Sequence, residues 1–321
     1  MFATRSLPGP AFGRLREEAD LALWTGPGAA PADALWRGTA DAEGLLCLLT
    51  DRVDAGLLAG CPRLRVVSSY SVGVDHVDLA AATARGVAVG HTPGVLTETT
   101  ADLAFALLLA AARRVAEADR FVREGRWTPE RSWEPDLLLG RDLHGATLGV
   151  VGLGPIGRAV ARRAAGFGME VLGWSRSPRE VPGVERVPLP ELLARSAFVS
   201  IHVALAPETR GLIGRAELAR MPAGAVLVNT ARGGIVDEEA LAEALSAGHL
   251  HAAGLDVFAQ EPLAPASPLR GLANVVLCPH LGSATVATRE RMAERAVANL
   301  AAGLAGERLP WCANPEVYAA G

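Results

Sequence analysis

Residues 147–163 read TLGVVGLGPIGRAVARR, an apolar run followed by three closely spaced glycines and an amphipathic stretch. The run at 147–151 predicts a buried strand, and the pattern GxGxxG at 152–157 stands between that strand and a predicted helix. Gly152 permits a tight turn, Gly154 lets a pyrophosphate approach the backbone, and Gly157 lets the helix pack closely on the strand. The positive end of the helix dipole then faces the phosphates. We therefore predict a dinucleotide-binding turn here, against the alternative of a purely structural glycine turn.

Short apolar runs alternate with longer amphipathic stretches on both sides of this turn, a pattern typical of βαβ units and parallel sheets. We expect strands at residues 45–49, 65–69, 147–151, 170–174, 198–203, 225–229 and 275–278. The predicted fold class is therefore α/β, with two Rossmann-like, doubly wound domains that each contain a parallel sheet.

Two stretches predict helices longer than the rest. The first begins near Thr97, after the helix breakers Pro93 and Gly94, and runs toward Arg123; its near-uniform apolarity predicts burial on several sides. The second covers about 284–304. If both cross between domains, residues 1–96 with 284–321 form a substrate-binding, flavodoxin-like domain, and 97–283 form the dinucleotide-binding Rossmann domain. The cleft between them is then the expected active site.

The composition excludes some classes of partner. The chain has 321 residues, is 50% hydrophobic and carries a formal net charge of -4, so it is long enough for two domains with cores of their own. No basic field attracts nucleic acid or an anionic membrane surface. The longest apolar stretch, at 103–112, is about half of what a bilayer-spanning helix needs. With no signal-peptide pattern at the start, we expect a cytoplasmic protein.

Cysteine and histidine spacing gives no metal signature. His249 and His251 do not face together on a helix, so we expect no metal site there. The cysteines are scattered along the chain, and we interpret them as reduced, structural thiols. They are Cys47, Cys61, Cys278 and Cys312.

The residues after the predicted strand 170–174 indicate which dinucleotide is preferred. An NAD enzyme carries an acidic residue at this place to bind the ribose hydroxyls. Here the sequence at 173–179 is GWSRSPR, without a carboxylate. Arg176 and Arg179 are suited to pair with a 2′-phosphate, and Ser175 or Ser177 to hydrogen-bond it. We expect NADP(H) to be preferred over NAD(H), the alternative being two solvated surface arginines.

Three ionisable residues, Arg232, Glu261 and His280, lie near the ends of predicted strands. Reduction of a keto acid needs a cation that holds the carboxylate and polarises the carbonyl, and a proton donor for the developing alkoxide. Arg232 and His280 are suited to these tasks, and Glu261 to orienting the imidazole and stabilising its protonated form. The alternatives are a helix-capping arginine, a surface acid and a core histidine. His202 closes another predicted strand, and we expect it to serve core packing, the alternative being a place near the cofactor.

The chain resembles the D-2-hydroxyacid dehydrogenases, most closely the glyoxylate/hydroxypyruvate reductases, over nearly its whole length. The resemblance rests on TR at 4–5 with Pro8, SVGVDHVD at 71–78, TPGVLTETTADLAFALLL at 92–109, GLGPIGRAVARR at 152–163, NTARGGIVDEEAL at 229–241, AAGLDVFAQEPL at 252–263 and PHLGSAT at 279–285. It implies a homodimer built through the coenzyme domains. Formate dehydrogenases of the same superfamily resemble this pattern with a glutamine at position 261, so the glutamate favours acid/base work.

The resemblance also implies roles for single residues. Arg232 binds substrate, Glu261 and His280 form the acid/base pair, and Asp256 holds the nicotinamide carboxamide. The backbone amides of Val72 and Gly73 receive the substrate carboxylate, a role that suits a glycine-containing loop. Further positions line the cofactor in such enzymes: Thr100, Pro155, Ile156, Ala204, Thr230, Gly282 and Ser283.

One position departs from the pattern of the mammalian-type glyoxylate reductases. Many of these place a tryptophan near Leu137, in a loop that reaches the partner's active site, whereas here Trp133 lies nearby in sequence. The expected reaction is hydride transfer from NADPH to glyoxylate or hydroxypyruvate, with His280 protonating the oxygen. The alternatives are another substrate (phosphoglycerate, a bulkier keto acid or phosphite) or a dinucleotide-sensing, corepressor-like binding protein.

Overall fold

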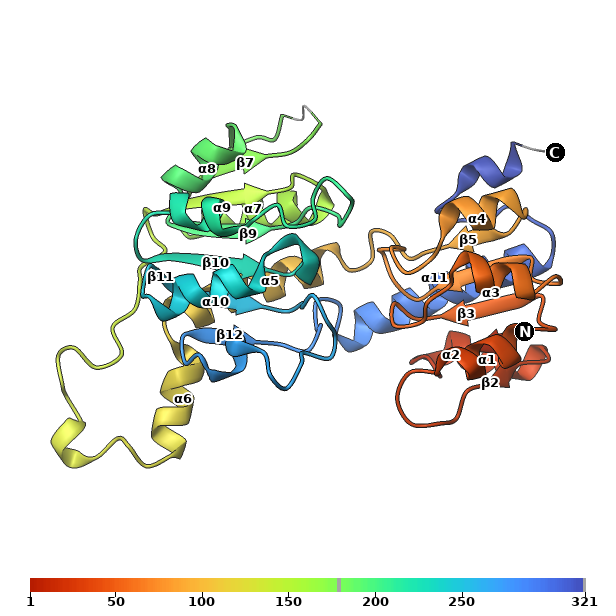
Figure 1. The fold of residues 1–321 in the computed structure, drawn as a ribbon, viewed down its shortest axis with the longest axis horizontal. Coiled ribbons are helices and arrows are strands. Elements are labelled where there is room, and N and C mark those ends of the chain that lie inside the picture. Colours follow the sequence, from red (N-terminus) through yellow and green to blue (C-terminus); the bar gives the residue numbers. More distant parts are fainter. Residues whose placement is uncertain (178–179, 320–321) are drawn as a thin grey trace. The chain divides into compact units, whose positions relative to one another are not determined.

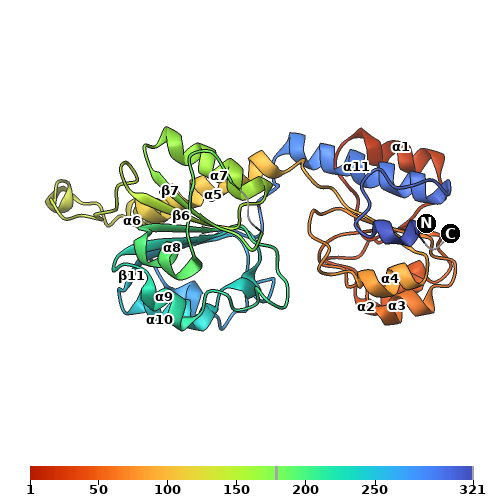
Figure 2. The ribbon, with the colours of Figure 1, turned by 90° about the horizontal axis from the view of Figure 1, so that it is seen from above.

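The computed structural model describes residues 1–177 and 180–319. The chain forms two compact units, Met1–Leu96 with Ser283–Gly321 and Thr97–Gly282. Each unit is a parallel sheet with helices on both faces, as the βαβ pattern predicts (Figures 1 and 2). In the part of the chain that the structure describes, no helix combines the length and apolarity needed to cross a membrane.

The first unit has the strand order β2-β1-β3-β4-β5, which is the flavodoxin-like order. Its strands are β1 (Phe2–Ala3), β2 (Ala22–Leu23), β3 (Gly44–Cys47), β4 (Val66–Ser69) and β5 (Ala88–Gly90). Its helices are α1 (Pro10–Glu18), α2 (Ala32–Thr39), α3 (Ala55–Gly60), α4 (Leu79–Ala84), α11 (Val286–Leu304) and the 3₁₀ turn η4 (Pro315–Tyr318).

The second unit has the order β12-β11-β10-β9-β6-β7-β8. Strands β7 and β8 are added on one side of β6 and strands β9 to β12 on the other, so the strand order switches between β6 and β9. Ligands of doubly wound sheets bind at the carboxyl ends of the strands beside such a switch point. The strands are β6 (Thr147–Val151), β7 (Glu170–Trp174), β8 (Glu185–Arg186), β9 (Phe198–Ile201), β10 (Ala225–Asn229), β11 (Leu250–Leu255) and β12 (Val275–Leu277).

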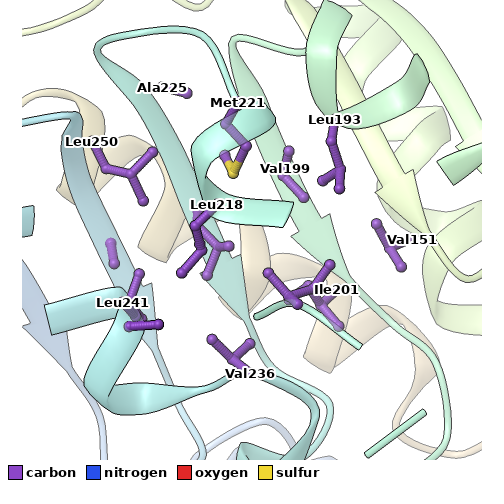
Figure 3. Close-up of a cluster of buried hydrophobic side chains, with 14 of the residues drawn as sticks. Val151, Leu193, Val199, Ile201, Leu218, Met221, Ala225, Val236, Leu241 and Leu250 are labelled. Carbon is purple, nitrogen blue, oxygen red and sulfur yellow. The ribbon is translucent and has the colours of Figure 1, made fainter. Parts of the chain in front are cut away.

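Helices cover both faces of this second sheet and bury an apolar core on each. One core packs the strands against α8 (Leu189–Arg195), α9 (Arg215–Arg220) and α10 (Glu238–Ser246), as Figure 3 shows around Leu218 and Leu241. The other packs them against α5 (Thr97–Ala112) and α7 (Pro155–Gly166). Because both faces are covered, the central strands β6, β9 and β10 are apolar at most positions, whereas the edge strand β8 consists of two exposed charged residues. The remaining elements are α6 (Val115–Arg123), η1 (Pro129–Arg131), η2 (Gly233–Ile235) and η3 (Pro268–Gly271).

The predicted strands 147–151, 170–174 and 225–229 are confirmed at both ends, three others differ by one or two residues at one end, and the strand predicted at 45–49 differs at both. The sequence reasoning missed β1, β2, β5, β8 and β11. The first, second and fourth of these are two residues long, and β11 reads LHAAGL, in which alanine and glycine have low strand propensity.

The long helix expected from Thr97 toward Arg123 is wrong as a single element. α5 ends at Ala112, and α6 begins at Val115 after Arg114 in the left-handed region with φ 54°. The carbonyl of Ala112 accepts hydrogen bonds from Arg141 N at 2.8 Å and His251 Nε2 at 3.3 Å. These partners, distant in sequence, end the helix there. The second long helix begins at Val286, with Thr285 as its N-cap.

Candidate active site

The turn between β6 and α7 is built as the glycine pattern predicts. Gly152 has φ +107°, and a Cβ at this position would lie 2.6 Å from the carbonyl carbon of His202. A Cβ on Gly157 would lie 1.9 Å from the carbonyl oxygen of Gly152, so the helix and the turn touch backbone to backbone. A Cβ on Gly154 would meet no atom within 4 Å, so open space lies beside the N-cap of α7. Glycine at 154 is therefore not required by the protein's own packing.

These residues fit a dinucleotide. Pro155 and Ile156 open α7, where backbone N–H groups have no partner inside the helix and suit an anion. Beyond the turn, Thr230 directly follows β10 and is only 8% exposed. Among the described residues, its hydroxyl has no hydrogen-bond partner. A buried hydroxyl without a hydrogen-bond partner destabilises the folded protein unless a bound ligand supplies that partner.

The segment expected to bind the adenosine ribose follows β7. The hydroxyl of Ser175 donates to the carbonyl of Ser177 at 2.7 Å, which folds the segment back on itself. Arg176 is exposed and pairs with Glu208 at 3.4 Å. Arg179 lies outside the described residues. An exposed ion pair of this length contributes little stability, so Arg176 is available to another anion.

His280 and Glu261 form the central pair of the site. The imidazole Nδ1 of His280 lies 2.7 Å from Oε2 of Glu261, while Oε1 accepts from the backbone N–H of Phe258 at 3.0 Å. Burial alone raises the pKa of Glu261, but the bonds from His280 and Phe258 and the charge of Arg232 outweigh it and hold that pKa below its ordinary value. The carboxylate is therefore charged at neutral pH, and Nε2 is the imidazole nitrogen turned away from it.

Asp256 fixes the segment that carries His280. It is 1% exposed, and its carboxylate accepts from the N–H groups of Leu281 at 2.6 Å and Gly282 at 2.8 Å. Its carbonyl accepts from His280 N at 2.9 Å. Three bonds to consecutive amides hold His280 in the left-handed region at φ 56°, where a residue other than glycine is uncommon. The carboxylate predicted to hold the nicotinamide thus also anchors the turn that carries His280, and burial raises its pKa.

Arg232 is positioned by the turn after β10. The Asn229 side chain donates to the carbonyl of Arg232 at 2.9 Å and accepts from Ala231 N at 3.0 Å. Next to it, a Cβ on Gly233 would lie 1.8 Å from the carbonyl carbon of Phe258. The turns after β10 and β11 therefore touch backbone to backbone, which brings the charge of Arg232 close enough to lower the pKa of Glu261.

The remaining predicted positions are distributed over both units. Thr100, in the first turn of α5, donates to the carbonyl of Gly282 at 2.8 Å. Ala204 is exposed in the loop after β9, and its carbonyl accepts from the hydroxyl of Thr209. Ser283, Val72 and Gly73 belong to the first unit.

Sequence reasoning missed several supporting residues. Asn229 and Gly233 were quoted only as part of a motif, and Glu238 received no role. Glu238 accepts from Ala259 N at 2.5 Å, and burial, followed by the charge of Glu261, raises its pKa. These contacts join segments far apart in the chain, and the only sequence signal for them is their place in NTARGGIVDEEAL at 229–241.

Comparison with known proteins gives consistent results. The protein-family model for the NAD binding domain of D-isomer specific 2-hydroxyacid dehydrogenases matches residues 105–282. A glyoxylate reductase of Korarchaeum cryptofilum (strain OPF8) is 50% identical over 321 residues, covering 99% of this chain and 96% of that protein. A crystal structure of a Thermus thermophilus protein is 51% identical, with TM-score 0.91 and coverage of 97% and 99%. The NADPH-dependent glyoxylate/hydroxypyruvate reductase of Sinorhizobium meliloti, solved with NADP and malonate, is 33% identical, with TM-score 0.87 and coverage of 98% and 97%.

Proposed function

This chain belongs to the D-isomer specific 2-hydroxyacid dehydrogenase family, and on that premise we propose that it reduces glyoxylate, and also hydroxypyruvate, to the D-2-hydroxy acid with NADPH. The observation that carries the proposal is the 2.7 Å contact between His280 Nδ1 and a charged Glu261 carboxylate, with Arg232 as the nearby cation. The glyoxylate reductase of Korarchaeum cryptofilum and the Sinorhizobium meliloti enzyme support this substrate class.

The side chains divide the reaction between them. When bound, the nicotinamide cofactor supplies the hydride that the carbonyl carbon accepts. Arg232 holds the substrate carboxylate and polarises the carbonyl, which stabilises the negative charge that develops on its oxygen. His280 gives the proton on Nε2 to that oxygen, so the hydride and the proton complete the hydroxyl-bearing carbon. Glu261 stays ionised throughout and stabilises the imidazolium before the transfer.

The preference for NADPH is supported by the segment after β7. This segment offers Arg176 and the hydroxyls of Ser175 and Ser177, and no carboxylate at 173–177 to bind ribose hydroxyls. Replacing Arg176 by alanine is expected to raise KM for NADPH about tenfold and to leave KM for NADH nearly unchanged. Arg220→Ala, at an exposed arginine of α9, is the matched control. A wild-type kcat/KM with NADH equal to that with NADPH contradicts the preference.

The second unit is proposed to carry the homodimer interface. α6 and the segment after it extend away from the sheet of this unit (Figure 1). They expose Val122 at 53%, Trp127 at 56% and Trp133 at 92%. Apolar side chains gathered on one projecting segment are typical of an interface. Light scattering of Val122→Lys with Trp127→Lys is expected to show a monomer; a wild-type monomer overturns the proposal.

The test of the reaction is steady-state kcat/KM for glyoxylate and for hydroxypyruvate, with NADPH and NADH in separate series. Rapid NADPH-dependent turnover of either acid, lost in His280→Ala, is the expected result. Turnover that survives this substitution removes His280 from the chemistry. No turnover of either acid overturns the proposed substrates, and the series then continues with larger keto acids and phosphite.

A further inference from the structure

In the loop that follows β4 in the first unit, three consecutive carbonyl groups each accept a hydrogen bond. The carbonyl of Ser71 accepts from Thr92 N at 2.8 Å. The carbonyl of Val72 accepts from Nδ1 of His91 at 2.9 Å, and that of Gly73 accepts from the hydroxyl of Ser71 at 2.6 Å. Two of these three bonds come from side chains.

Tying the carbonyls fixes the direction of the amides. In a trans peptide the C=O of one residue and the N–H of the next point in opposite directions. The N–H groups of Val72, Gly73 and Val74 therefore point away from the bonds that hold the loop. Within the described residues, none of these three N–H groups has an acceptor. Successive backbone N–H groups in a turn, left without a protein acceptor, are suited to bind an anion.

A chain of hydroxyl groups leads to this loop, and its direction follows from chemistry. The carbonyl of Gly73 can only accept, so the proton of Ser71 Oγ is used there. Ser69 Oγ, 2.6 Å from Ser71 Oγ, must then donate to it. His76 Nε2, 3.0 Å from Ser69 Oγ, must in turn donate to Ser69. Three bonds of one polarity therefore end on the Gly73 carbonyl, and bonds in such a chain strengthen one another.

His91 is itself held firmly. It follows β5, its carbonyl accepts from the Asn299 side chain at 3.0 Å, and its N–H donates to the Trp311 carbonyl at 3.1 Å. Asn299 is fully buried. Because a carbonyl only accepts, Nδ1 of His91 must carry the proton that binds Val72. The ring is thus a fixed donor and not a mobile surface side chain.

We propose that His91 and the chain formed by Ser71, Ser69 and His76 are positioning residues that hold the three amides of residues 72–74 as the seat of the substrate carboxylate. This inference rests on the proposed function, which takes a small keto acid as substrate. None of these four side chains needs to touch the substrate. Their effect is on where the carboxylate binds, and so on KM, and not on the hydride or proton transfer.

The experiment measures KM and kcat for glyoxylate, KM for NADPH, and the inhibition constant of oxalate, a dianion without a reducible carbonyl. Ser71→Ala and His91→Leu are each expected to raise KM for glyoxylate and the oxalate constant about tenfold, as the loss of one oriented donor predicts. We expect kcat to change by less than about threefold and KM for NADPH to stay constant. Ser69→Ala, one bond further away, is expected to give about a threefold rise by the same reasoning.

Two controls separate positioning from general damage. Ser68 is also buried in β4, and its hydroxyl donates to the carbonyl of Ala296 at 2.7 Å. This bond does not belong to the hydrogen-bond series that ends on Gly73, so Ser68→Ala loses a comparable bond elsewhere. We expect its KM values to match the wild type. His91→Asn keeps a donor at the same branch of the side chain and is expected to restore KM to within about threefold of wild type.

Equal KM changes in Ser68→Ala and Ser71→Ala, or no rescue by His91→Asn, overturn the inference. A lower kcat with an unchanged KM in Ser71→Ala also overturns it, because that result indicates a smaller folded fraction. Failure of the proposed function is distinguishable, since the wild-type protein then shows no glyoxylate turnover before any variant is compared.

Discussion

The turn after β6 and the turn after β4 both present backbone N–H groups outward, yet they are built differently. The first relies on glycine: Gly152 adopts φ +107°, and Gly157 lets α7 approach. The second contains one glycine, Gly73, and relies on His91 and Ser71 to hold its carbonyls. In the first turn the missing side chains leave space beside the backbone for the proposed dinucleotide, and in the second the side chains that are present hold the proposed seat of the carboxylate.

The difference matters for how each turn fails. A glycine turn is intolerant of added atoms, because the space it leaves is its function. A tethered turn tolerates changes in volume but depends on donors, because each lost hydrogen bond frees one peptide group to rotate. Steric substitutions therefore test the first turn, and donor substitutions test the second.

The largest expected effect comes from a substitution that removes the proposed proton donor without changing the turn after β4 or the turn after β6. His280→Gln removes the proton donor and leaves both anion-binding turns in place, so kcat for glyoxylate is expected to fall about 10³-fold. KM for NADPH is expected to stay near the wild-type value. Single-turnover measurements with saturating NADPH check this. A large rise in KM for NADPH in this variant would show that His280 also contributes to NADPH binding, which contradicts this expectation.

The next effect tests steric intolerance in the glycine turn. Gly152→Ala places a Cβ 2.6 Å from the carbonyl carbon of His202 at a positive φ, so we expect the NADPH Kd to rise about 100-fold and unfolding free energy to fall by about 3 kcal/mol. Gly154→Ala, where the Cβ meets only open space, is the matched variant. It is expected to keep its stability within about 1 kcal/mol and to lose about tenfold in NADPH affinity, measured by fluorescence titration.

A smaller effect on rate concerns the partner of His280. Glu261→Gln is expected to lower kcat about 30-fold, since the amide orients the imidazole but does not stabilise its charged form. The pKa of Glu261 lies below its ordinary value, so in the wild type the carboxylate stays charged from about pH 5 upward. In the variant, the alkaline fall of reductase activity is expected at lower pH. An unshifted pH profile of kcat shows that the carboxylate acts by orientation alone.

The smallest effect concerns His202, whose backbone lies against the glycine turn and whose ring is 2.7 Å from the hydroxyl of Ser200. Burial lowers the pKa of His202 to about 3. Between about pH 6.5 and pH 3 the unfolded chain therefore binds a proton that the folded chain does not, and stability falls as pH falls. Denaturant unfolding is expected to show that the wild type loses about 1–2 kcal/mol more than His202→Gln between pH 7 and pH 5. Equal losses contradict this; His144→Gln, at an exposed histidine, is the control.

The sequence allowed much of the second unit to be predicted. Its buried strands are continuous apolar runs, so β6, β7 and β10 were predicted to the residue. The pair of His280 and Glu261 was also predicted from residue chemistry and resemblance. The two-residue strands and the break between α5 and α6 were not, because a short strand has no period and the break depends on Arg141 and His251.

What the sequence determined by itself was the fold class, the glycine turn and the candidate reacting side chains, since these depend on local pattern and on the chemistry of single residues. Tertiary structure alone decided how those side chains are held. Asp256 grips the amides of Leu281 and Gly282 across 25 and 26 positions, and His91 grips the Val72 carbonyl across 19. A hydrogen bond between distant segments exists only after the sheets have formed, because the strand order sets which loops meet.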